Sequence, residues 1–246
     1  ALALQERGYT VYELSRRAEG MPDIRHIVAD ITKEETLQAA VEQVLAVEGR
    51  LDLVVNNAGF GISGAIEFTD TQEAQRLFDT LFFGMVRMNR CVIPFMRQQG
   101  HGRIVNISSV AAPVPIPFQA YYSAGKAAIN AYTMALANEL RPFGVTVCAV
   151  MPGDIKTGFT AARHKIIDGD DIYQGRIGRS VQRMEHDEQT GMDPAKVGRY
   201  IAAVASREGS HHPLYATRID YKFFVFLTKV LPARFLNWLI YQLYGK

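Results

Sequence analysis

Three apolar runs of the sequence each end in small or polar residues, and this repeated pattern constrains the fold more than any other feature. The run LDLVV precedes Asn56–Gly59 (NNAG), RIV precedes 106–109 (NISS), and VTVCAV precedes PGDIKT at Pro152–Thr157. Short, strongly apolar runs of this kind predict buried strands. We therefore expect an α/β fold with a parallel sheet, in which ligands bind at the carboxyl ends of the strands.

Residues near the second run carry side chains suited to proton transfer. Tyr122 and Lys126 are four residues apart, so one turn of a helix places them on the same face. Ser109 ends the NISS segment. A tyrosine phenol is a poor acid–base catalyst at neutral pH unless a nearby cation stabilises its anion, and Lys126 can supply that charge. Ser109 would hold the substrate oxygen while Tyr122 gives or takes the proton.

A tyrosine and a lysine at this spacing are a weak signal alone, but together with NNAG, NISS and PGDIKT they give the chain a specific resemblance. It resembles a short-chain dehydrogenase/reductase from its first residues to about Ser206. The resemblance implies a single Rossmann-like domain with a doubly wound parallel sheet in three layers, and hydride transfer between a nicotinamide cofactor and an alcohol or carbonyl. In that pattern Tyr122 is the general acid or base, Lys126 binds the nicotinamide ribose and lowers the tyrosine pKa, and Ser109 orients the substrate.

The first residues of the chain resemble the interior of a Rossmann unit and not its start. LALQERG predicts the last turns of a helix ending at Gly8, and TVYEL predicts the strand that follows. A Rossmann unit begins earlier, with a strand and a glycine-rich turn for the pyrophosphate, about twenty residues in all. A sheet without that strand would expose two edges. We therefore expect a fragment that lacks its first strand. A natural deletion, which would fold poorly and bind no cofactor, is the alternative.

The residues after TVYEL indicate the choice of cofactor. An NAD enzyme of this family has an acidic residue there, whereas this chain has Ser15, Arg16 and Arg17. Two guanidinium groups suit a 2′-phosphate, so the pattern favours NADP(H), with NAD(H) as the alternative. A basic loop in solvent would have the same composition.

The segment HIVADIT places Asp30 and Ile31 at the end of a further strand. The family pattern implies that both bind the cofactor, with the Asp30 carboxylate accepting a hydrogen bond from the adenine amino group. Asp30 could instead cap the next helix, although Thr32 suits the N-cap better, with Glu35 completing a capping box.

The remaining cofactor residues that the family implies follow the first and third apolar runs. Asn56, Ala58 and Gly59 lie where the chain turns beneath the cofactor, and Gly59 permits its close approach. Asn57 is instead expected to tie strands together. The PG turn after the third run brings a second set to the nicotinamide carboxamide: Pro152, Gly153, Ile155 and Thr157.

One position departs from the family pattern. The segment FDTLFFG has Leu81 where the family has an asparagine that helps to hold water linking the lysine to solvent. A leucine side chain has no hydrogen-bonding group. We therefore expect a slower proton relay more than a loss of the chemistry.

Two helical segments carry apolar stripes, which indicate either assembly or simple packing on the chain's own sheet. Their members recur at three- and four-residue spacing: Met85, Met88, Val92 and Phe95 in one, and Ile129, Tyr132, Leu136 and Leu140 in the other. The family pairs these helices with a second subunit, which implies a homodimer or homotetramer.

Two regions late in the chain indicate where substrate binds. Residues 154–195 are polar and aperiodic and predict a substrate lid, in which His164 and His186 have no metal-like partners, so no metal site is expected. The apolar extension 213–246 is split at Pro232, and neither half is long enough to cross a bilayer. Core packing is the default for it. The alternatives are a cover over an apolar substrate pocket and contact with a membrane surface.

Composition excludes several other classes of protein. A net charge of +2 over 246 residues gives no basic surface for nucleic acid, and 48% apolar residues suffice for one globular domain. Cys91 and Cys148 lie far apart without metal or redox spacing, which predicts buried thiols in a cytoplasmic protein.

We therefore predict an NADP(H)-dependent oxidoreductase of a hydrophobic ketone, aldehyde or alcohol. The extension resembles that of the steroid and retinol dehydrogenase branch, which implies a steroid-, retinoid- or lipid-like substrate. A catalytically weak cofactor-binding or scaffold protein of the same fold is the alternative, because Leu81 replaces the family asparagine and no phosphate-binding turn appears.

Overall fold

The described strands all pair in parallel, as the apolar runs predict. The structure is a computed structural model that describes residues 1–207, 209 and 211–246. The main sheet has the strand order β3-β5-β6-β8, and a second sheet pairs β1 with β2. The bounds are β1 Tyr12–Ser15, β2 Arg25–Val28, β3 Leu53–Asn56, β5 Gly102–Ile107, β6 Val145–Met151 and β8 Leu214–Ala216. A short third pair joins β4 Ile62–Ser63 to β7 His164–Lys165.

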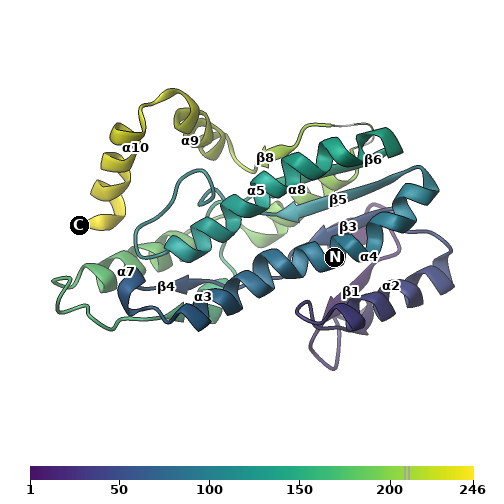
Figure 1. Cartoon of the computed structure of the whole chain (residues 1–246), viewed down its shortest axis with the longest axis horizontal. Helices are drawn as coiled ribbons and strands as arrows, with labels where there is room; N and C mark the ends of the chain where they lie inside the picture. Colours follow the sequence, from purple (N-terminus) through teal and green to yellow (C-terminus); the bar gives the residue numbers. More distant parts are fainter. Residues whose placement is uncertain (208, 210) are drawn as a thin grey trace.

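Helices flank the strands in the layered α/β arrangement expected from the sequence (Figure 1). The long ones are α2 Glu34–Glu48, α4 Gly84–Gln99, α5 Ala120–Leu140 and α8 Pro194–Ala205, and a short helix, α1 Leu2–Gln5, precedes β1. Asp193 caps α8 as predicted, since its carboxylate accepts a hydrogen bond from the backbone N–H of Ala195 at 3.0 Å.

The apolar core lies on both faces of the main sheet. Ile104 and Val105 are adjacent in β5, fully buried, and belong to clusters on opposite faces. The stripe residues of α4 and α5 are also buried here, except for the half-buried Tyr132 and the exposed Phe95. For the buried members, packing on the chain's own sheet is therefore the correct interpretation, and they offer no free surface to a second subunit. Cys148 is buried and Cys91 half-buried.

The two sheets are not joined to each other. A cavity of about 2340 Å³ is lined by residues of both β1 and β3. Among the described strands, β1 and β3 each pair on one side only, so each has an unpaired edge.

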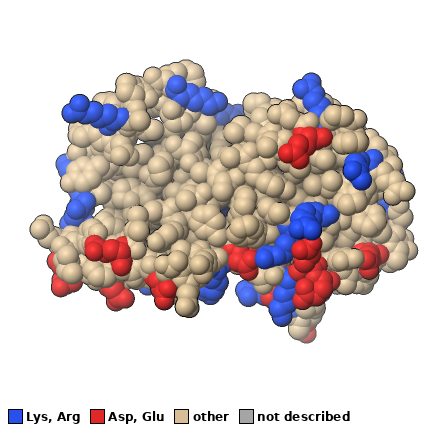
Figure 2. All heavy atoms as spheres, in the orientation of Figure 1, with Lys and Arg blue, Asp and Glu red and all other residues tan. Residues whose placement is uncertain are grey.

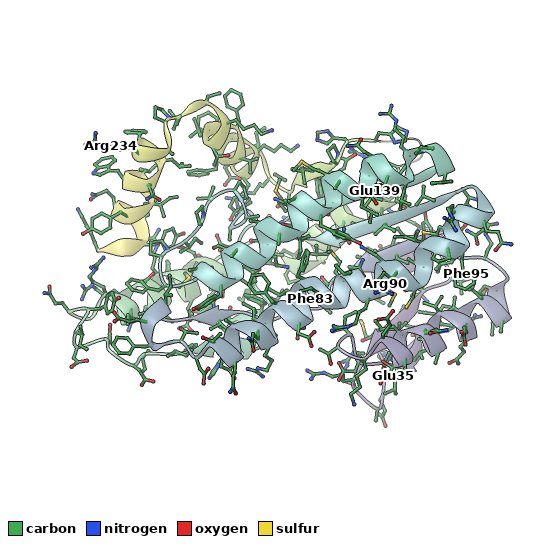
Figure 3. All side chains as sticks on the ribbon, viewed as in Figure 1. Glu35, Phe83, Arg90, Phe95, Glu139 and Arg234 are labelled. Carbon is green, nitrogen blue, oxygen red and sulfur yellow. The ribbon has the colours of Figure 1, made fainter. Side chains whose placement is uncertain are left out.

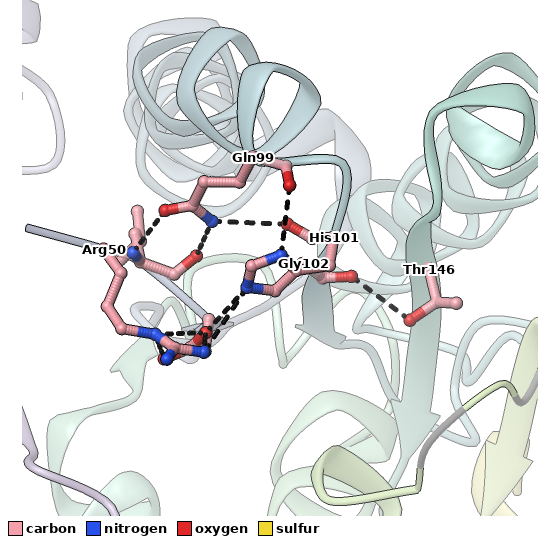
Figure 4. Close-up of polar contacts among 7 residues, drawn as sticks. Arg50, Gln99, His101, Gly102 and Thr146 are labelled. Carbon is pink, nitrogen blue, oxygen red and sulfur yellow. Dashed lines mark hydrogen bonds and ion pairs between the residues drawn. The ribbon is translucent and has the colours of Figure 1, made fainter.

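Polar side chains fix the amino ends of β3 and β5, far from the predicted ligand residues (Figure 4). Gln99 accepts a hydrogen bond from the backbone N–H of Leu51 at 2.8 Å and donates one to its carbonyl at 2.9 Å. Arg50 and His101 both contact the Asp52 carboxylate, at 2.7 and 3.1 Å. This edge of the sheet is structural, which leaves the carboxyl ends for ligands.

The segment 154–195 is more ordered than its sequence suggested. It contains α6 Phe159–Ala162 and a helix of 14 residues, α7 Arg176–Gln189. Ile177, Val181 and Met184 recur along α7 at helical spacing and are buried against Ala65. The prediction of an aperiodic segment was wrong because numerous charges on the outer face of α7 mask this stripe. His164 is exposed and contacts Glu73 at 2.9 Å.

The C-terminal extension begins with β8, a strand of the main sheet that buries Tyr215 and Ala216, but the helices after it are not core elements. The extension then forms α9 Ile219–Val230 and α10 Ala233–Ile240, separated at Pro232 as predicted, and a π-helical turn at Tyr241–Gly245. No residue of α9 is buried, and α10 buries only Ile240, so the default of core packing was wrong for these two helices. Figure 1 shows the two helices as an arch beside the domain. Among the described residues, no helix is long and apolar enough to cross a membrane.

Candidate active site

The structure brings Ser109, Tyr122 and Lys126 together at the carboxyl ends of β5 and β6. The loop after β5 is held to the end of β6, since Ser108 N–H donates to Val150 at 2.8 Å and Val110 N–H donates to Pro152 at 2.9 Å. Tyr122 and Lys126 occupy the first two turns of α5. The Ser109 side chain hydrogen-bonds to the Tyr122 phenol, and Lys126 Nζ lies 5.5 Å from the centre of its ring.

The electrostatics of this cluster differ from the expectation. Burial raises the pKa of Tyr122 to about 12, and only the hydrogen bond from Ser109 opposes it strongly. Burial also lowers the pKa of Lys126 to about 8, and its Nζ donates to the carbonyl of Ile107 at 2.7 Å. The predicted lowering of the tyrosine pKa is therefore wrong for this structure, because desolvation outweighs the hydrogen bond from Ser109 and the positive charge of Arg163.

A buried ion pair forms a second side of the site, and sequence reasoning missed it. The Phe159 ring lies 5.6 Å from the Tyr122 ring, and the Arg163 guanidinium lies 5.6 Å from Phe159. Arg163 pairs with Glu188, whose carboxylate also accepts a hydrogen bond from Thr160 at 2.5 Å. The two charged residues are 25 positions apart, with Arg163 directly after α6 and Glu188 in α7, and no sequence spacing rule connects such a pair.

The Leu81 side chain lies against Gly59, where a Cβ would be in any other residue. Leu81 is 2% exposed and lies in a π-helical turn, Asp79–Phe83, between α3 Thr71–Phe78 and α4. Its side chain approaches Gly59 so closely that no Cβ would fit there, and it lies 3.5 Å from the position of a Cβ at Gly125. The absence of a side chain at Gly59 therefore makes room for Leu81, and because Gly59 also lines the large cavity, the close approach of a cofactor there stays a prediction.

Asn56 takes the role predicted for Asn57. The Asn56 amide donates to Asn89 at 2.8 Å and to Asn106 at 2.9 Å, and so ties β3 to α4 and β5. The Asn56 amide is thus used in hydrogen bonds within the protein. Asn56, Asn57, Ala58 and Gly59 all line the cavity.

The PG turn is divided between two roles. Pro152 is buried and accepts the hydrogen bond from Val110, and the open side of Gly153 is filled by the Tyr221 ring of α9. Neither residue lines the large cavity, in contrast to Ile155 and Thr157, which do. The family assignment of all four to the cofactor therefore has direct geometric support only for the latter two.

Near the end of β1, only one of the two arginines faces the cavity. Ser15 and Arg16 line it, whereas the Arg17 guanidinium forms an ion pair with Glu13. Arg16 is exposed and forms no ion pair with the described residues. A single unpaired cation beside a dinucleotide-sized cavity still fits a 2′-phosphate, so the residues present fit NADP(H).

Asp30 and Ile31 line the same cavity at the end of β2. Asp30 accepts hydrogen bonds from the backbone N–H and the hydroxyl of Thr32, at 3.0 and 2.8 Å, which lower its carboxyl pKa. Helix α2 begins after Lys33, and Thr32 makes no cap. The predicted capping box was wrong because Asp30 binds the Thr32 hydroxyl.

Comparisons with known proteins agree with this geometry. The family model described as short chain dehydrogenase matches residues 3–166. The chain is 38% identical over 242 residues to a 3-ketodihydrosphingosine reductase of Bacteroides thetaiotaomicron, which covers 97% of this chain and 87% of that protein. It is 33% identical over 165 residues to an NADPH-dependent 1-acyldihydroxyacetone phosphate reductase of Schizosaccharomyces pombe, covering 64% of this chain and 55% of that one. The crystal structure of a short-chain dehydrogenase from Streptomyces avermitilis superposes with a TM-score of 0.80 at 32% identity, over 92% of this chain and 85% of that one.

Proposed function

Because the chain belongs to the short-chain dehydrogenase family of oxidoreductases that act on hydroxyl and carbonyl groups, we propose that it reduces a hydrophobic ketone with NADPH. The observation that carries this proposal is the cluster of Ser109, Tyr122 and Lys126 beside a cavity that most of the predicted cofactor residues line. The cofactor, when bound, supplies the hydride.

The chain's own residues supply the proton and hold the carbonyl. Ser109 donates a hydrogen bond to the substrate oxygen, and Tyr122 donates the proton that this oxygen takes up. Since the pKa of Tyr122 is about 12, the phenol is protonated at neutral pH and is ready to act as an acid. This protonation state favours reduction of a ketone over oxidation of an alcohol. Lys126 helps to hold the nicotinamide ribose and keeps a positive charge near the phenol.

The choice of NADP(H) is supported by Arg16 and by the NADPH-dependent relative from Schizosaccharomyces pombe. NAD(H) stays the alternative, because only one of the two arginines that follow β1, Arg16, lines the cavity. A 2′-phosphate would take Arg16 as its counter-charge, whereas NADH would leave this cation without an ionic partner.

The substrate class follows from the Bacteroides relative, whose name specifies a long-chain lipid ketone. We propose a lipid-like ketone for this chain too, with residues 154–195 and the start of α9 covering it. Tyr221, which fills the open side of Gly153, places the apolar extension directly beside the site. A steroid or retinoid ketone is the second candidate.

We also propose a cytoplasmic protein whose extension rests on a membrane surface and whose α4 contributes to a homodimer or homotetramer. Phe83, the last residue of the π-helical turn before α4, is 50% exposed, and Phe95 of α4 is 36% exposed; the two lie on either side of Arg90 (Figure 3). These two rings, in place of the buried stripe, are the apolar groups that a second subunit would cover.

Turnover of NADPH with a panel of ketones tests the proposed activity. We expect oxidation of NADPH with 3-ketodihydrosphingosine or another long-chain ketone, and a loss of about 10² to 10⁴ in kcat for Tyr122→Phe, which keeps the ring and removes the acid. Turnover of small polar sugars alone, with no steroid, retinoid or lipid ketone accepted, would refute the substrate class.

The alternative, a cofactor-binding protein with little catalysis, is favoured by Leu81, which leaves an apolar side chain where the family relays protons. Quenching of NADPH fluorescence separates binding from chemistry. Binding without turnover of any ketone, in the wild type and in Leu81→Asn, would establish the alternative.

A further inference from the structure

Asp154 is a carboxylate beside the reacting groups that has no cationic partner among the described residues. Other carboxylates of this region are held in ion pairs: Glu188 with Arg163, Asp187 with Arg183 at 3.0 Å, and Asp220 with Arg218. The Asp154 carboxylate is therefore the one in this group without an ion pair of its own among the described residues. A partly buried charge of this kind is costly unless a ligand neutralises it.

The position of this carboxylate is fixed by the fold. Asp154 follows the PG turn, and the carbonyl of Pro152 is bonded to the loop that carries Ser109. The Tyr221 hydroxyl donates to Asp154 Oδ2 at 3.0 Å, and the Asp154 carbonyl accepts from Met192 N–H at 2.8 Å. Burial raises the pKa of Asp154, and after burial the negative charges of Glu188 and Asp154 help to raise that of the Tyr122 phenol. Asp154 is thus electrostatically coupled to the proton donor.

Arg163 gives a second, independent indication of a polar ligand group. Its side chain has 0% exposed surface, and Nη2 binds Glu188. Its Nε and Nη1 have no hydrogen-bond partner among the described residues. Buried N–H donors are normally satisfied, so these two suit an oxygen supplied by a ligand. Phe159 connects the guanidinium to Tyr122 by ring contacts of 5.6 Å on each side.

We propose that Asp154 binds a positively charged amino group on the carbon next to the substrate carbonyl, while Arg163 donates a hydrogen bond to a nearby hydroxyl oxygen. The preferred substrate is then a long-chain amino ketone, and this inference rests on the proposed function and narrows it. The substrate named for the Bacteroides relative, 3-ketodihydrosphingosine, carries an amino group beside its ketone and a hydroxyl group one carbon further. A carboxylate next to the carbonyl pocket favours such a head group over an uncharged one.

Two substrates and one conservative variant test the proposal. Asp154→Asn keeps the shape and the acceptor for Tyr221 but removes the charge. We expect its kcat/KM for 3-ketodihydrosphingosine to fall by about 10- to 100-fold, mainly through KM, while that for 1-hydroxyoctadecan-3-one, which lacks the amino group, changes less than about threefold. Asp23→Asn, which changes an exposed carboxylate in the loop before β2, should change neither.

The outcomes separate this inference from the proposed function. An equal loss with both substrates, or no loss, overturns the role of Asp154 while the ketone reductase activity stands. Failure of the wild type to reduce either substrate refutes both proposals. If Asp154→Asn does not fold, inhibition of the wild type decides: dodecylamine should inhibit at least about tenfold more strongly than dodecanol at neutral pH, and equal inhibition overturns the inference.

Discussion

The Leu81 side chain packs against Gly59, in the space that a side chain at position 59 would take, just after the carboxyl end of β3. This contact joins the residue that departs from the family pattern to the segment beneath the cofactor. Leu81 therefore has a packing role of its own at this site, in addition to lacking the hydrogen-bonding group of the family asparagine. Changes at position 81 are therefore expected to affect both stability and turnover.

Leu81→Asn should restore a polar group for proton relay and raise turnover, while it lowers the free energy of unfolding by about 2 to 3 kcal/mol. The cost arises because Leu81 is 2% exposed and packs with Ile62 and Leu77. Steady-state kinetics and urea unfolding measure the two effects. Leu77→Asn is the matched control, since it should cost similar stability with no gain in turnover. An unchanged rate for Leu81→Asn would show that position 81 does not limit the relay.

Arg16 and Arg17 should differ sharply in their effect on cofactor choice. Arg16→Ala removes the cation that lines the cavity, so KM for NADPH should rise by about 10- to 100-fold with little change for NADH. Arg17→Ala breaks only an exposed ion pair with Glu13 and should change both values less than about threefold. Kinetics with the two cofactors check this prediction, which fails if Arg17→Ala has the larger effect.

Stability should rise with pH above the pKa of Lys126. Burial lowers this pKa to about 8 from an ordinary 10.5, so the unfolded chain binds more protons than the folded one between these values. The free energy of unfolding therefore gains about 2 kcal/mol from this group as the pH rises from 8 to 10. Urea unfolding at both pH values should show this gain in the wild type and lose it in Lys126→Met. An identical pH dependence in the two proteins would contradict the lowered pKa.

Gly153 and Tyr221 should be energetically coupled. A Cβ at Gly153 would overlap the Tyr221 ring, so Gly153→Ala should lower the free energy of unfolding by about 1 to 3 kcal/mol and displace the start of α9. Tyr221→Ala removes the overlap, and the double variant should cost less than the sum of the single ones. Urea unfolding of the four proteins gives the coupling energy. Strictly additive costs would mean that the ring is free to move away from the turn.

The strands and the catalytic cluster could be predicted because their signals are local in the sequence. Buried strands of a parallel sheet are continuous apolar runs, and the spacing of Tyr122 and Lys126 is one helical turn. The buried pair of Arg163 and Glu188 has no such local signal, because the fold alone brings α6 and α7 together. This ion pair could therefore be found only from the three-dimensional structure.

Two glycines show a related limit of prediction from sequence, since the residue that packs against a glycine is not visible in the sequence. The sequence shows that space is required at Gly59 and at Gly153, but it does not say what occupies that space. The structure answers with Leu81 and with Tyr221, two residues distant in sequence from the glycines they contact. A family pattern suggests cofactor for both, since a ligand is the usual reason for a close approach at these turns.

The C-terminal extension should bind anionic membranes. Its exposed apolar side chains are Ile219, Phe223, Phe224, Phe226, Val230, Phe235, Trp238, Tyr241 and Leu243. Lys222, Lys229, Arg234 and Lys246 outnumber its one acidic residue, Asp220. In Figure 2, cations border this part of the molecule and acidic groups gather mostly on the opposite side. Apolar area and positive charge on one surface favour an interface with anionic phospholipid.

Co-sedimentation with vesicles of neutral and of anionic phospholipid measures this binding. We expect the wild type to bind anionic vesicles more strongly, with about 1 kcal/mol lost for each of Lys229→Gln and Arg234→Gln. The variant Phe223→Ser/Trp238→Ser should lose binding to both kinds of vesicle, whereas Val47→Ser, an exposed residue on α2, should not. If the wild type binds neither vesicle and the Phe223→Ser/Trp238→Ser variant instead turns a dimer into a monomer, the surface joins two copies of the chain and the membrane proposal is wrong.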